Sequence, residues 1–411
     1  MASARTLASG WVILGVRRVI SGSGGQTTRY CHHSMKIAML LHKTVVHDSR
    51  VRREASALVG AGYEVLVLEL GAVDTPVLDG FRRRSVLPAA WVRRLLPSFV
   101  YRLAFFASFV RAIVAERPDV IHAHDAAMLL PGLIGRRLTG ARLIYDSHEL
   151  ATSVPYRERA WASFVAAIER LAIPRTVAIV TVSDGIALRL RQRYALRRTP
   201  VVVRNVSDLD LTGVDGGLRE RAGIGREIPL VLHQGAAAPA RGCDMLVRAL
   251  VDLPDAHLVF LGDADVAYEG WLRGLVVRLG LQDRVTLLPS VPLERLLDHT
   301  VEADVGVTLL QDTCENHRLA LPNKLFEYVA AGIPVVVADL PEARRVVDEY
   351  GIGWTTDPAD PLALAAALRS ALDARSDEVR RARMEVARER LRWSVEREHL
   401  IALYDAVRDS L

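Results

Sequence analysis

Short apolar runs alternate with longer amphipathic segments along the chain from Met35 onward. The runs are rich in Val, Ile and Leu, which is typical of strands covered on both faces of a parallel sheet. In the longer segments apolar residues recur every three or four positions, which indicates helices, the first of them over about Val51–Ala61. Such alternation predicts a doubly wound parallel sheet. The strands are predicted at Ile37–Leu41, Val65–Leu70, Asp119–Ala123, Leu143–Tyr145, Ala178–Val182 and Val201–Val203.

The alternation is interrupted once and then starts again. Residues 208–228 contain Gly and Asp without sustained periodicity, so they are predicted to link a domain at 35–207 to a domain at 229–390. A ligand is expected between the two units, at the carboxyl ends of their strands. Residues 391–411 are predicted to form a last helix. The strands of the second unit are predicted at Pro229–His233, His257–Leu261, Val285–Leu288, Val305–Leu309 and Pro334–Val337.

Composition is that of a globular protein, with 50% hydrophobic and 25% charged residues over 411 positions. The net charge of +5 is mild for this length and no nucleic-acid-binding module is recognised, so nucleic acid is not an expected partner. The three cysteines are scattered and form no CxxC pair, which fits a reducing cytoplasm.

Residues 1–34 precede the first predicted strand. We interpret them either as a disordered extension or as the result of a start codon placed too early, with Met35 as the true start.

The segment Leu321–Val337 carries the most specific candidate chemistry. Pro322 suits the start of a helix, because its missing N–H would be unpaired there, and Gly332 suits the end. Lys324 and Glu327 lie one turn apart on the predicted helix. A helix N-terminus with a lysine favours an anion, and a carboxylate one turn further along can bind paired hydroxyls. Phosphate and ribose at this spacing indicate a nucleotide.

The run Pro322-Asn-Lys-Leu-Phe-Glu-Tyr328 followed by Ala331-Gly-Ile-Pro-Val-Val336 resembles the donor-binding signature of retaining glycosyltransferases of family 4. The resemblance implies the GT-B fold, in which two Rossmann-like domains face each other across a cleft and the last helix crosses back to the first. It also implies that Asn323 and Lys324 face the diphosphate of a nucleotide sugar and that Glu327 holds the ribose. Weaker similarity extends over the chain from about Met35 to the C-terminus.

One position departs from the family pattern. Many members carry a second glutamate eight residues before the one that matches Glu327, and here that position is Leu319. Some members with the Pro-Asn-Lys form also lack it, so the difference concerns the contact with the donor sugar more than the activity. Glu315 lies in the same loop but out of register.

A loop of small residues, Gly235–Gly242, follows the first predicted strand of the second unit. Its backbone N–H groups can approach a diphosphate and Arg241 can bind the oxygens, although ordinary turn chemistry is an equal alternative. The resemblance matches Arg241 and Gly242 to the end of a glycine-rich donor loop. Phe260–Ala264 resembles the family's turn beneath the nucleotide base, or is a simple strand-to-loop turn.

In the first domain, His148 follows a predicted strand, and a histidine at that end of a strand faces the ligand. The resemblance matches it to a histidine near the reacting centre, so His148 is the candidate catalytic residue. Helix capping by its polar neighbours is the alternative interpretation of this segment.

His122-Ala-His-Asp125 could suggest a metal, but no third ligand stands at a recognisable spacing, and no metal is expected. Asp125 is a candidate for the acceptor side or for a helix cap.

The loop after the first strand contains His47, Asp48 and Arg50. Capping of the next helix explains Asp48 in ordinary terms. In the family this loop approaches the acceptor, so all three residues are acceptor-side candidates.

Residues 81–114 interleave arginines with aromatic and aliphatic residues. A helix of this kind either lies on an anionic membrane surface or packs on its own sheet.

The expected activity is transfer of a sugar from a UDP-, GDP- or ADP-sugar to a hydroxyl of a glycan or lipid-linked acceptor, with retention of configuration. No bound cofactor is expected. The protein is expected in the cytoplasm, either free or in peripheral contact with the inner face of the membrane. Two alternatives remain: a nucleotide-sugar epimerase of the same architecture, and an inactive, donor-binding partner subunit.

Overall fold

The computed structural model describes residues 34–71, 75–86, 98–153, 159–206, 213 and 217–410, except for the side chains of 98–102 and 159–160. Residues 1–33 of the predicted extension lie outside this description. In the described part of the chain, no helix combines the length and apolar character that crossing a membrane requires.

The first domain is built on an eight-stranded sheet in the order β3-β4-β2-β1-β5-β6-β7-β8. Neighbouring strands are parallel except for β3 and β4. Strand β1 is central, and its Ile37 pairs with Val65 on one side and Val120 on the other. The strands are β1 (Lys36–Leu41), β2 (Glu64–Glu69), β3 (Val77–Leu78), β4 (Phe81–Ser85), β5 (Val120–His124), β6 (Arg142–Ser147), β7 (Ala178–Thr181) and β8 (Val201–Val202).

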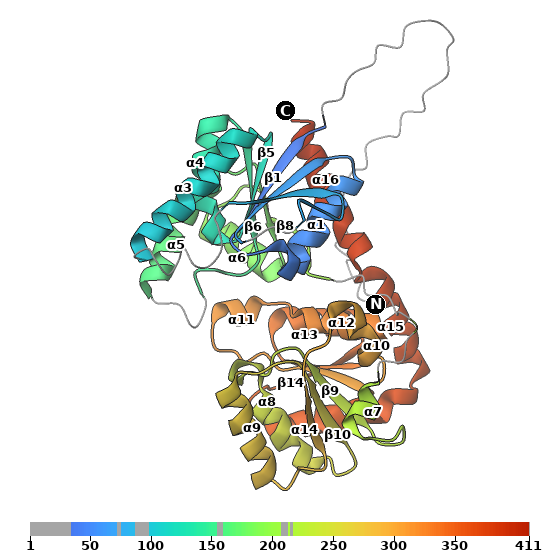
Figure 1. Cartoon of the computed structure of the whole chain (residues 1–411). Helices are drawn as coiled ribbons and strands as arrows, with labels where there is room; N and C mark the ends of the chain where they lie inside the picture. The colour runs from blue at the N-terminus through green and yellow to red at the C-terminus, as the bar shows by residue number, and fades with distance from the viewer. Residues whose placement is uncertain are drawn as a thin grey trace, which may run out of the picture. The chain divides into compact units, whose positions relative to one another are not determined.

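Helices cover both faces of this sheet (Figure 1). Side chains of β1 alternate between the faces. Ile37 and Met39 pack with one set of helices, α1 and α16, whereas Ala38 and Leu40 pack with residues of α3, α4 and α5. The helices of the first domain are α1 (Ser49–Gly60), α3 (Ser98–Glu116), α4 (Ala126–Thr139), α5 (Arg159–Ala172) and α6 (Asp184–Arg193), with short turns η1 (Val45–His47) and η2 (Ile173–Arg175).

The second domain has a six-stranded, fully parallel sheet in the order β11-β10-β9-β12-β13-β14. Its strands are β9 (Leu230–Gln234), β10 (His257–Leu261), β11 (Val285–Leu288), β12 (Val305–Thr308), β13 (Val335–Ala338) and β14 (Gly353–Thr356). Its helices are α7 (Leu218–Ala222), α8 (Cys243–Ala249), α9 (Val266–Arg278), α10 (Leu293–Thr300), α11 (Glu315–Leu319), α12 (Asn323–Ala331), α13 (Pro341–Tyr350), α14 (Pro361–Asp373) and α15 (Glu378–Arg390), with turns η3 (Pro239–Arg241), η4 (Leu250–Asp252) and η5 (Ala374–Ser376).

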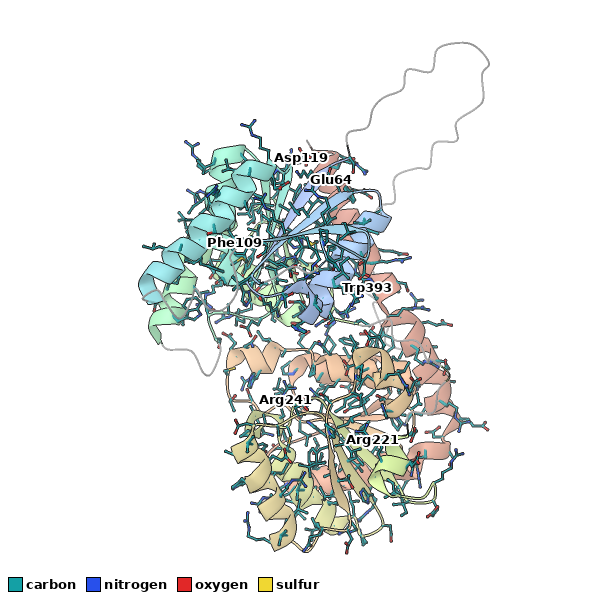
Figure 2. The ribbon with its side chains drawn as sticks, in the orientation of Figure 1. Glu64, Phe109, Asp119, Arg221, Arg241 and Trp393 are labelled. Carbon is teal, nitrogen blue, oxygen red and sulfur yellow. The ribbon has the colours of Figure 1, made fainter. Side chains whose placement is uncertain are left out.

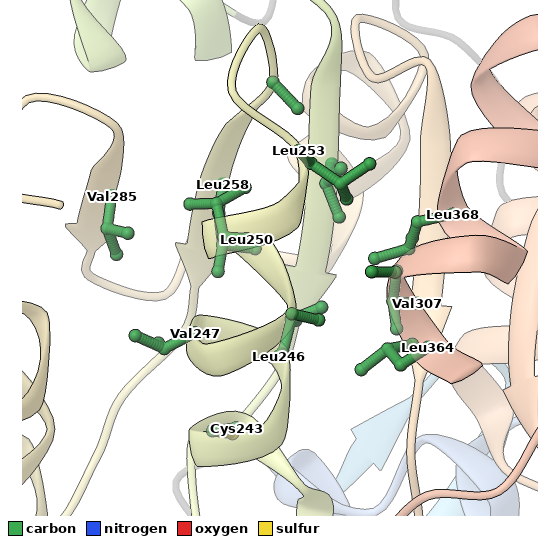
Figure 3. Close-up of a cluster of buried hydrophobic side chains, with 14 of the residues drawn as sticks. Cys243, Leu246, Val247, Leu250, Leu253, Leu258, Val285, Val307, Leu364 and Leu368 are labelled. Carbon is green, nitrogen blue, oxygen red and sulfur yellow. The ribbon is translucent and has the colours of Figure 1, made fainter. Parts of the chain in front are cut away.

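Each face of the second sheet has its own apolar core. On one face, residues such as Leu246, Leu258 and Leu364 join α8, α9 and α14 to the strands (Figure 3). On the other face, Phe326 and Val329 bring α12 into a cluster with α13 and α15. The expected architecture of two Rossmann-like domains is confirmed.

The last helix, α16 (Trp393–Arg408), belongs to the core of the first domain. Trp393, labelled in Figure 2, and Leu400 are buried among residues of the first sheet and α1. The Tyr404 hydroxyl lies 2.8 Å from Nδ1 of His122 on β5. The chain therefore crosses back to the first domain, as the resemblance implies.

The helical interpretation of residues 81–114 is wrong at its start. Phe81–Ser85 is strand β4, in which Phe81 and Arg83 are buried and Arg82 and Arg84 are exposed. The Arg83 guanidinium is paired with buried Glu69 at 2.7 Å. The two-residue alternation was obscured because a buried ion pair places an arginine on the covered face, where an apolar residue is expected.

Residues 87–97, which carry part of the proposed membrane surface, lie outside the described residues. Within α3, Phe109 and Ile113 are fully buried against the first sheet and α4. Phe109 is labelled in Figure 2. For these residues the structure supports packing on the protein's own sheet.

Candidate functional site

Helix α12 forms where the motif predicts it. Pro322 precedes its first residue, and Gly332 ends it in a left-handed conformation with φ of 74°. Tyr328 fixes the helix to the sheet: its hydroxyl lies 3.1 Å from both Leu232 O and Val307 O, and it accepts a hydrogen bond from the Gln234 N–H. The helix N-terminus is thereby held at the carboxyl ends of β9 and β12.

A pocket of about 500 Å³ opens at this point. Strand ends, the small-residue loop, α11 and the start of α12 all contribute to its wall. The lining residues are His233, Ala238, Ala240, Arg241, Thr308, Leu310, His317, Ala320, Pro322, Asn323 and Lys324. No carboxylate is among these described lining residues.

Two cationic side chains, Arg241 and Lys324, converge on the pocket. Neither forms an ion pair within the described residues. Dehydration, then the charge of Arg241, lower the pKa of Lys324 to about 8, against the opposing effect of Glu327. Burial, followed by the charges of Lys324 and Arg241, lowers the pKa of His233 to about 3. A site with two cations that lack an ion-pair partner, and with a helix N-terminus, favours a multiply charged anion. Figure 2 labels Arg241.

The predicted loop glycines have identifiable steric roles. Gly235 has a φ of +81°, and a Cβ there would lie 2.8 Å from Lys324 Nζ. Gly242 has a φ of +64°, and a Cβ there would lie 2.7 Å from Gln311 Nε2. Gly235 therefore lets the loop approach Lys324, and Gly242 lets it approach Leu309 and Gln311, because neither position carries a side chain.

The turn Phe260–Ala264 also approaches this loop. A Cβ at Gly262 would lie 2.5 Å from Gly235 O, and the Asp263 backbone accepts a hydrogen bond from the Ala237 N–H at 3.0 Å. The turn thus holds the small-residue loop in place.

Glu327 lies one turn further along α12. Gln234 Nε2 donates a hydrogen bond to its Oε2 at 2.5 Å, and Thr300 Oγ1 donates to Gln234 Oε1 at 2.9 Å. Burial raises the pKa of Glu327, while the Gln234 hydrogen bond and the Lys324 charge act against this. The carboxylate is therefore oriented by a residue that the motif did not suggest, Gln234 at the end of β9.

In the first domain, His148 lies in a histidine–carboxylate cluster. Its Nε2 is 3.1 Å from Asp146 Oδ2 and 3.2 Å from His124 Nδ1, and its Nδ1 is 3.5 Å from Asp125 Oδ2. Burial opposes charge on the ring, but Asp125 and Asp146 overcome it and raise the pKa of His148 to about 9. At neutral pH the ring is charged, so it can donate hydrogen bonds but cannot act as a base.

Asp125 does not form the predicted helix cap. Its side chain makes no capping hydrogen bond to α4, and its φ is +63°, a conformation that is rare outside glycine. The Asp125 carboxylate remains partly exposed beside His148. Its role on the acceptor side stays a prediction.

The loop before α1 separates the other acceptor-side candidates. His47 is exposed, whereas Asp48 accepts a hydrogen bond from the Val51 N–H and caps α1. Arg50 is only 3% exposed and its guanidinium is bonded to both oxygens of Asp146 and to Val203 O. The prediction that Arg50 contacts the acceptor is therefore wrong, because its donors are engaged inside the domain. Asp48 has the capping role that ordinary chemistry predicts.

Beneath His148 is a fully buried group of Glu54, His122, His124 and Asp146, whose ligand-type atoms lie within 4.8 Å of one another. The sequence suggested the two histidines but not Glu54, which comes from α1 and is distant in the chain. These side chains are of the kind that bind zinc. The Arg50 guanidinium, however, already lies 3.0 Å from both carboxylates and compensates their charge.

Leu319 does not line the pocket. It packs partly buried against the core of the first domain that contains Ile186 and Leu190. Its carbonyl accepts a hydrogen bond from Ser183 Oγ at 2.7 Å. Glu315, the out-of-register acid, is paired with Arg189 at 2.7 Å. The loop therefore brings neither residue to the pocket, and His317 is the side chain from α11 that reaches it.

Two family models match the chain. The model for Glycosyltransferase Family 4 matches residues 49–211, and the model for Glycosyl transferases group 1 matches residues 218–390. Together they cover most of the sequence, one on each domain. The chain belongs to the family 4 glycosyltransferases.

Curated relatives share parts of the chain. It is 36% identical over 170 residues to a D-inositol 3-phosphate glycosyltransferase of Xylanimonas cellulosilytica, which covers 41% of this chain and 39% of the relative. It is 28% identical over 293 residues to the protein of the same name from Geodermatophilus obscurus, covering 66% and 63%. The chain therefore spans less than two thirds of the length of these relatives.

A solved structure shows the same fold. HepE of Anabaena in complex with UDP-glucose superposes with a TM-score of 0.71 at 17% sequence identity, covering 90% of this chain and 100% of that chain. At this level of identity the likeness establishes the GT-B architecture alone.

Proposed function

We propose that this family member is a retaining glycosyltransferase that transfers a sugar from a nucleoside diphosphate donor to an acceptor hydroxyl. The observation that carries the proposal is the pair of uncompensated cations, Arg241 and Lys324, at the N-terminus of α12. A diphosphate would supply the missing negative charge. Glu327, one turn away and held by Gln234, would accept hydrogen bonds from the ribose hydroxyls.

Transfer would separate charge between an oxocarbenium-like sugar and a departing diphosphate. Arg241, Lys324 and the first N–H groups of α12 would stabilise the leaving diphosphate electrostatically. Since no carboxylate is among the described residues that line the pocket, no side chain there is assigned as a nucleophile. The charged ring of His148 would donate a hydrogen bond to the reacting sugar or the acceptor.

The acceptor is proposed to be a hydroxyl of a glycan or a lipid-linked molecule. Because the curated relatives are named D-inositol 3-phosphate glycosyltransferases, inositol phosphate is a further acceptor worth testing. Asp125, partly exposed beside His148, and exposed His47 are the proposed acceptor-side residues.

The direct test incubates the purified protein with radiolabelled UDP-, GDP- and ADP-sugars, together with a lipid extract, a glycan extract or inositol phosphates. Label in an acceptor product, with the anomeric configuration of the donor, is the expected result. An altered free sugar nucleotide would indicate an epimerase, and donor binding without turnover would indicate an inactive partner subunit. An epimerase would require carboxylates around the sugar, and the described pocket lining has none.

A matched pair of variants links the activity to the pocket. Lys324→Ala should abolish measurable transfer and weaken donor binding. Lys36→Ala should change neither, since Lys36 is paired with Glu116 in the first domain. Equal activity of the two variants would remove α12 from the proposed mechanism.

A further inference from the structure

The donor pocket continues beyond its two cations to a histidine that no motif singled out. His317 lies on α11, which precedes α12 in the chain, and it lines the same pocket as Arg241 and Lys324. Leu310 and Ala320 also line the pocket and carry no polar side-chain group. His317 therefore offers one of the few uncharged polar groups in this wall.

The surroundings of His317 fix the orientation of its ring. Nδ1 lies 3.0 Å from Gln311 O and 2.8 Å from Thr313 Oγ1. A carbonyl oxygen can only accept a hydrogen bond, so Nδ1 carries a proton. In the neutral ring, Nε2 is then the acceptor, and it has no hydrogen-bond partner within the described residues. The loop thus holds a ring with one nitrogen engaged by the protein and one available to a ligand.

The shared pocket wall of His317 and Lys324 points to the part of the donor that this ring would contact. Glu327 lies one turn inside α12, Lys324 lies in the first turn, and His317 lies before the helix begins. If the proposed function holds, ribose and diphosphate occupy the first two positions, and the transferred sugar is the next group. Sugars present hydroxyl groups, for which a neutral imidazole nitrogen is a suitable acceptor.

We propose that His317 Nε2 accepts a hydrogen bond from a hydroxyl of the transferred sugar and thereby selects among donor sugars. This inference rests on the proposed function and adds a residue to it. His317 acts as a specificity residue, because it contacts the part of the donor that differs between sugar nucleotides. The diphosphate and the nucleoside do not depend on it.

The test compares two ligands on four proteins by calorimetry. The ligands are a nucleoside diphosphate and the corresponding nucleotide sugar, for the base that the wild type prefers. The proteins are the wild type, His317→Ala, His317→Gln, whose amide can replace the ring acceptor, and His399→Ala, which removes an exposed histidine on α16.

Binding of the nucleoside diphosphate should be the same in all four proteins. Binding of the nucleotide sugar should weaken about 3- to 10-fold in His317→Ala, the factor associated with one hydrogen bond. His317→Gln should recover part of this loss. Nucleotide sugars that lack one hydroxyl should identify the contacted group: the correct deoxy donor binds the wild type and His317→Ala equally.

Two results would overturn the inference. If His317→Ala weakens both ligands equally, the ring supports the loop rather than the sugar. If it weakens neither, Nε2 makes no contact. Failure of the wild type to bind any nucleoside diphosphate is a different outcome, because it would remove the proposed function itself and this inference with it.

Discussion

At the scale of single residues, the proposed donor pocket is defined by two cations that form no ion pair within the described residues. Lysine is protonated below its pKa, and the pKa of Lys324 is lowered to about 8 by dehydration and by Arg241. The cationic form, which is proposed to bind a diphosphate, therefore predominates at neutral pH and is lost as the pH rises through 8.

This titration predicts a pH dependence of donor binding. Affinity for a nucleotide sugar, which has no titrating phosphate in this range, should fall about tenfold between pH 7 and pH 9. The variant Lys324→Ala should bind the nucleotide sugar weakly at both pH values, and its affinity should not show this tenfold change. Calorimetry at a series of pH values measures this, and a wild-type affinity that does not change between pH 7 and pH 9 would contradict the role of Lys324.

Arg50 illustrates a second kind of charged residue, one that is buried and fully paired. Asp146 and Glu54 lie 3.0 Å from its guanidinium. Arg50→Ala would leave buried Glu54 without its paired cation and remove one of the two cations beside buried Asp146. We expect a loss of about 3–5 kcal/mol in the free energy of unfolding.

Thermal and denaturant unfolding of this variant would measure the loss. Arg52→Ala is the matched control, because Arg52 is two positions away on the same helix, half-exposed, and paired with Asp79 at the surface. It should cost less than about 1 kcal/mol. Equal losses in the two variants would show that the buried network does not stabilise the first domain.

At the scale of secondary-structure elements, α12 depends on a hydroxyl that joins it to two strands. Tyr328→Phe would remove the partner of Gln234 N and leave the carbonyls of Leu232 and Val307 without it. The expected cost is about 1–3 kcal/mol of unfolding free energy, because polar groups would be buried without a partner.

Tyr350→Phe provides the comparison, since Tyr350 is only half-buried at the end of α13. Its melting temperature should stay close to that of the wild type, while that of Tyr328→Phe should fall. A fall of the same size in both variants would indicate that the three contacts of Tyr328 add nothing specific.

Element by element, the sequence predicts most strands that are continuous apolar runs, such as Leu258 and its neighbours in β10. It fails where tertiary contacts decide the pattern. The sequence does not indicate β4, because Arg83 is buried against Glu69, and it does not indicate β14, because the residues of this strand are mostly half-buried at a sheet edge. Short edge strands carry too little periodicity to be distinguished from loops.

The same limit applies to the candidate site. Lys324, Arg241 and Asn323 could be predicted, because local motif spacing places them at one helix terminus and one loop. Gln234, Glu54 and His317 could not. Each of these side chains reaches its site because of the strand order of a sheet or the path of a loop. Neither of these can be derived from a single sequence.

At the scale of the whole molecule, the chain ends in a helix that stabilises the domain in which it began. Leu400 of α16 is fully buried with Leu58 of α1 and Val120 of β5 in one core. Leu400→Ala should therefore reduce the stability of the first domain by about 2–5 kcal/mol.

Hydrogen exchange would locate this effect. Loss of protection should appear in β1 and α1, which are distant from residue 400 in the chain, and not in β9 or β10 of the second domain. Exchange that increases only in the second domain would contradict the assignment of α16 to the first.

The proposed function requires that the pocket at the start of α12 binds the diphosphate of a sugar nucleotide. A crystal structure with a non-hydrolysable nucleotide sugar tests it most directly. We expect phosphate oxygens within hydrogen-bonding distance of Lys324 Nζ and the Arg241 guanidinium, and the ribose hydroxyls within hydrogen-bonding distance of Glu327. A nucleotide bound elsewhere on the protein, with this pocket holding only solvent, would contradict it.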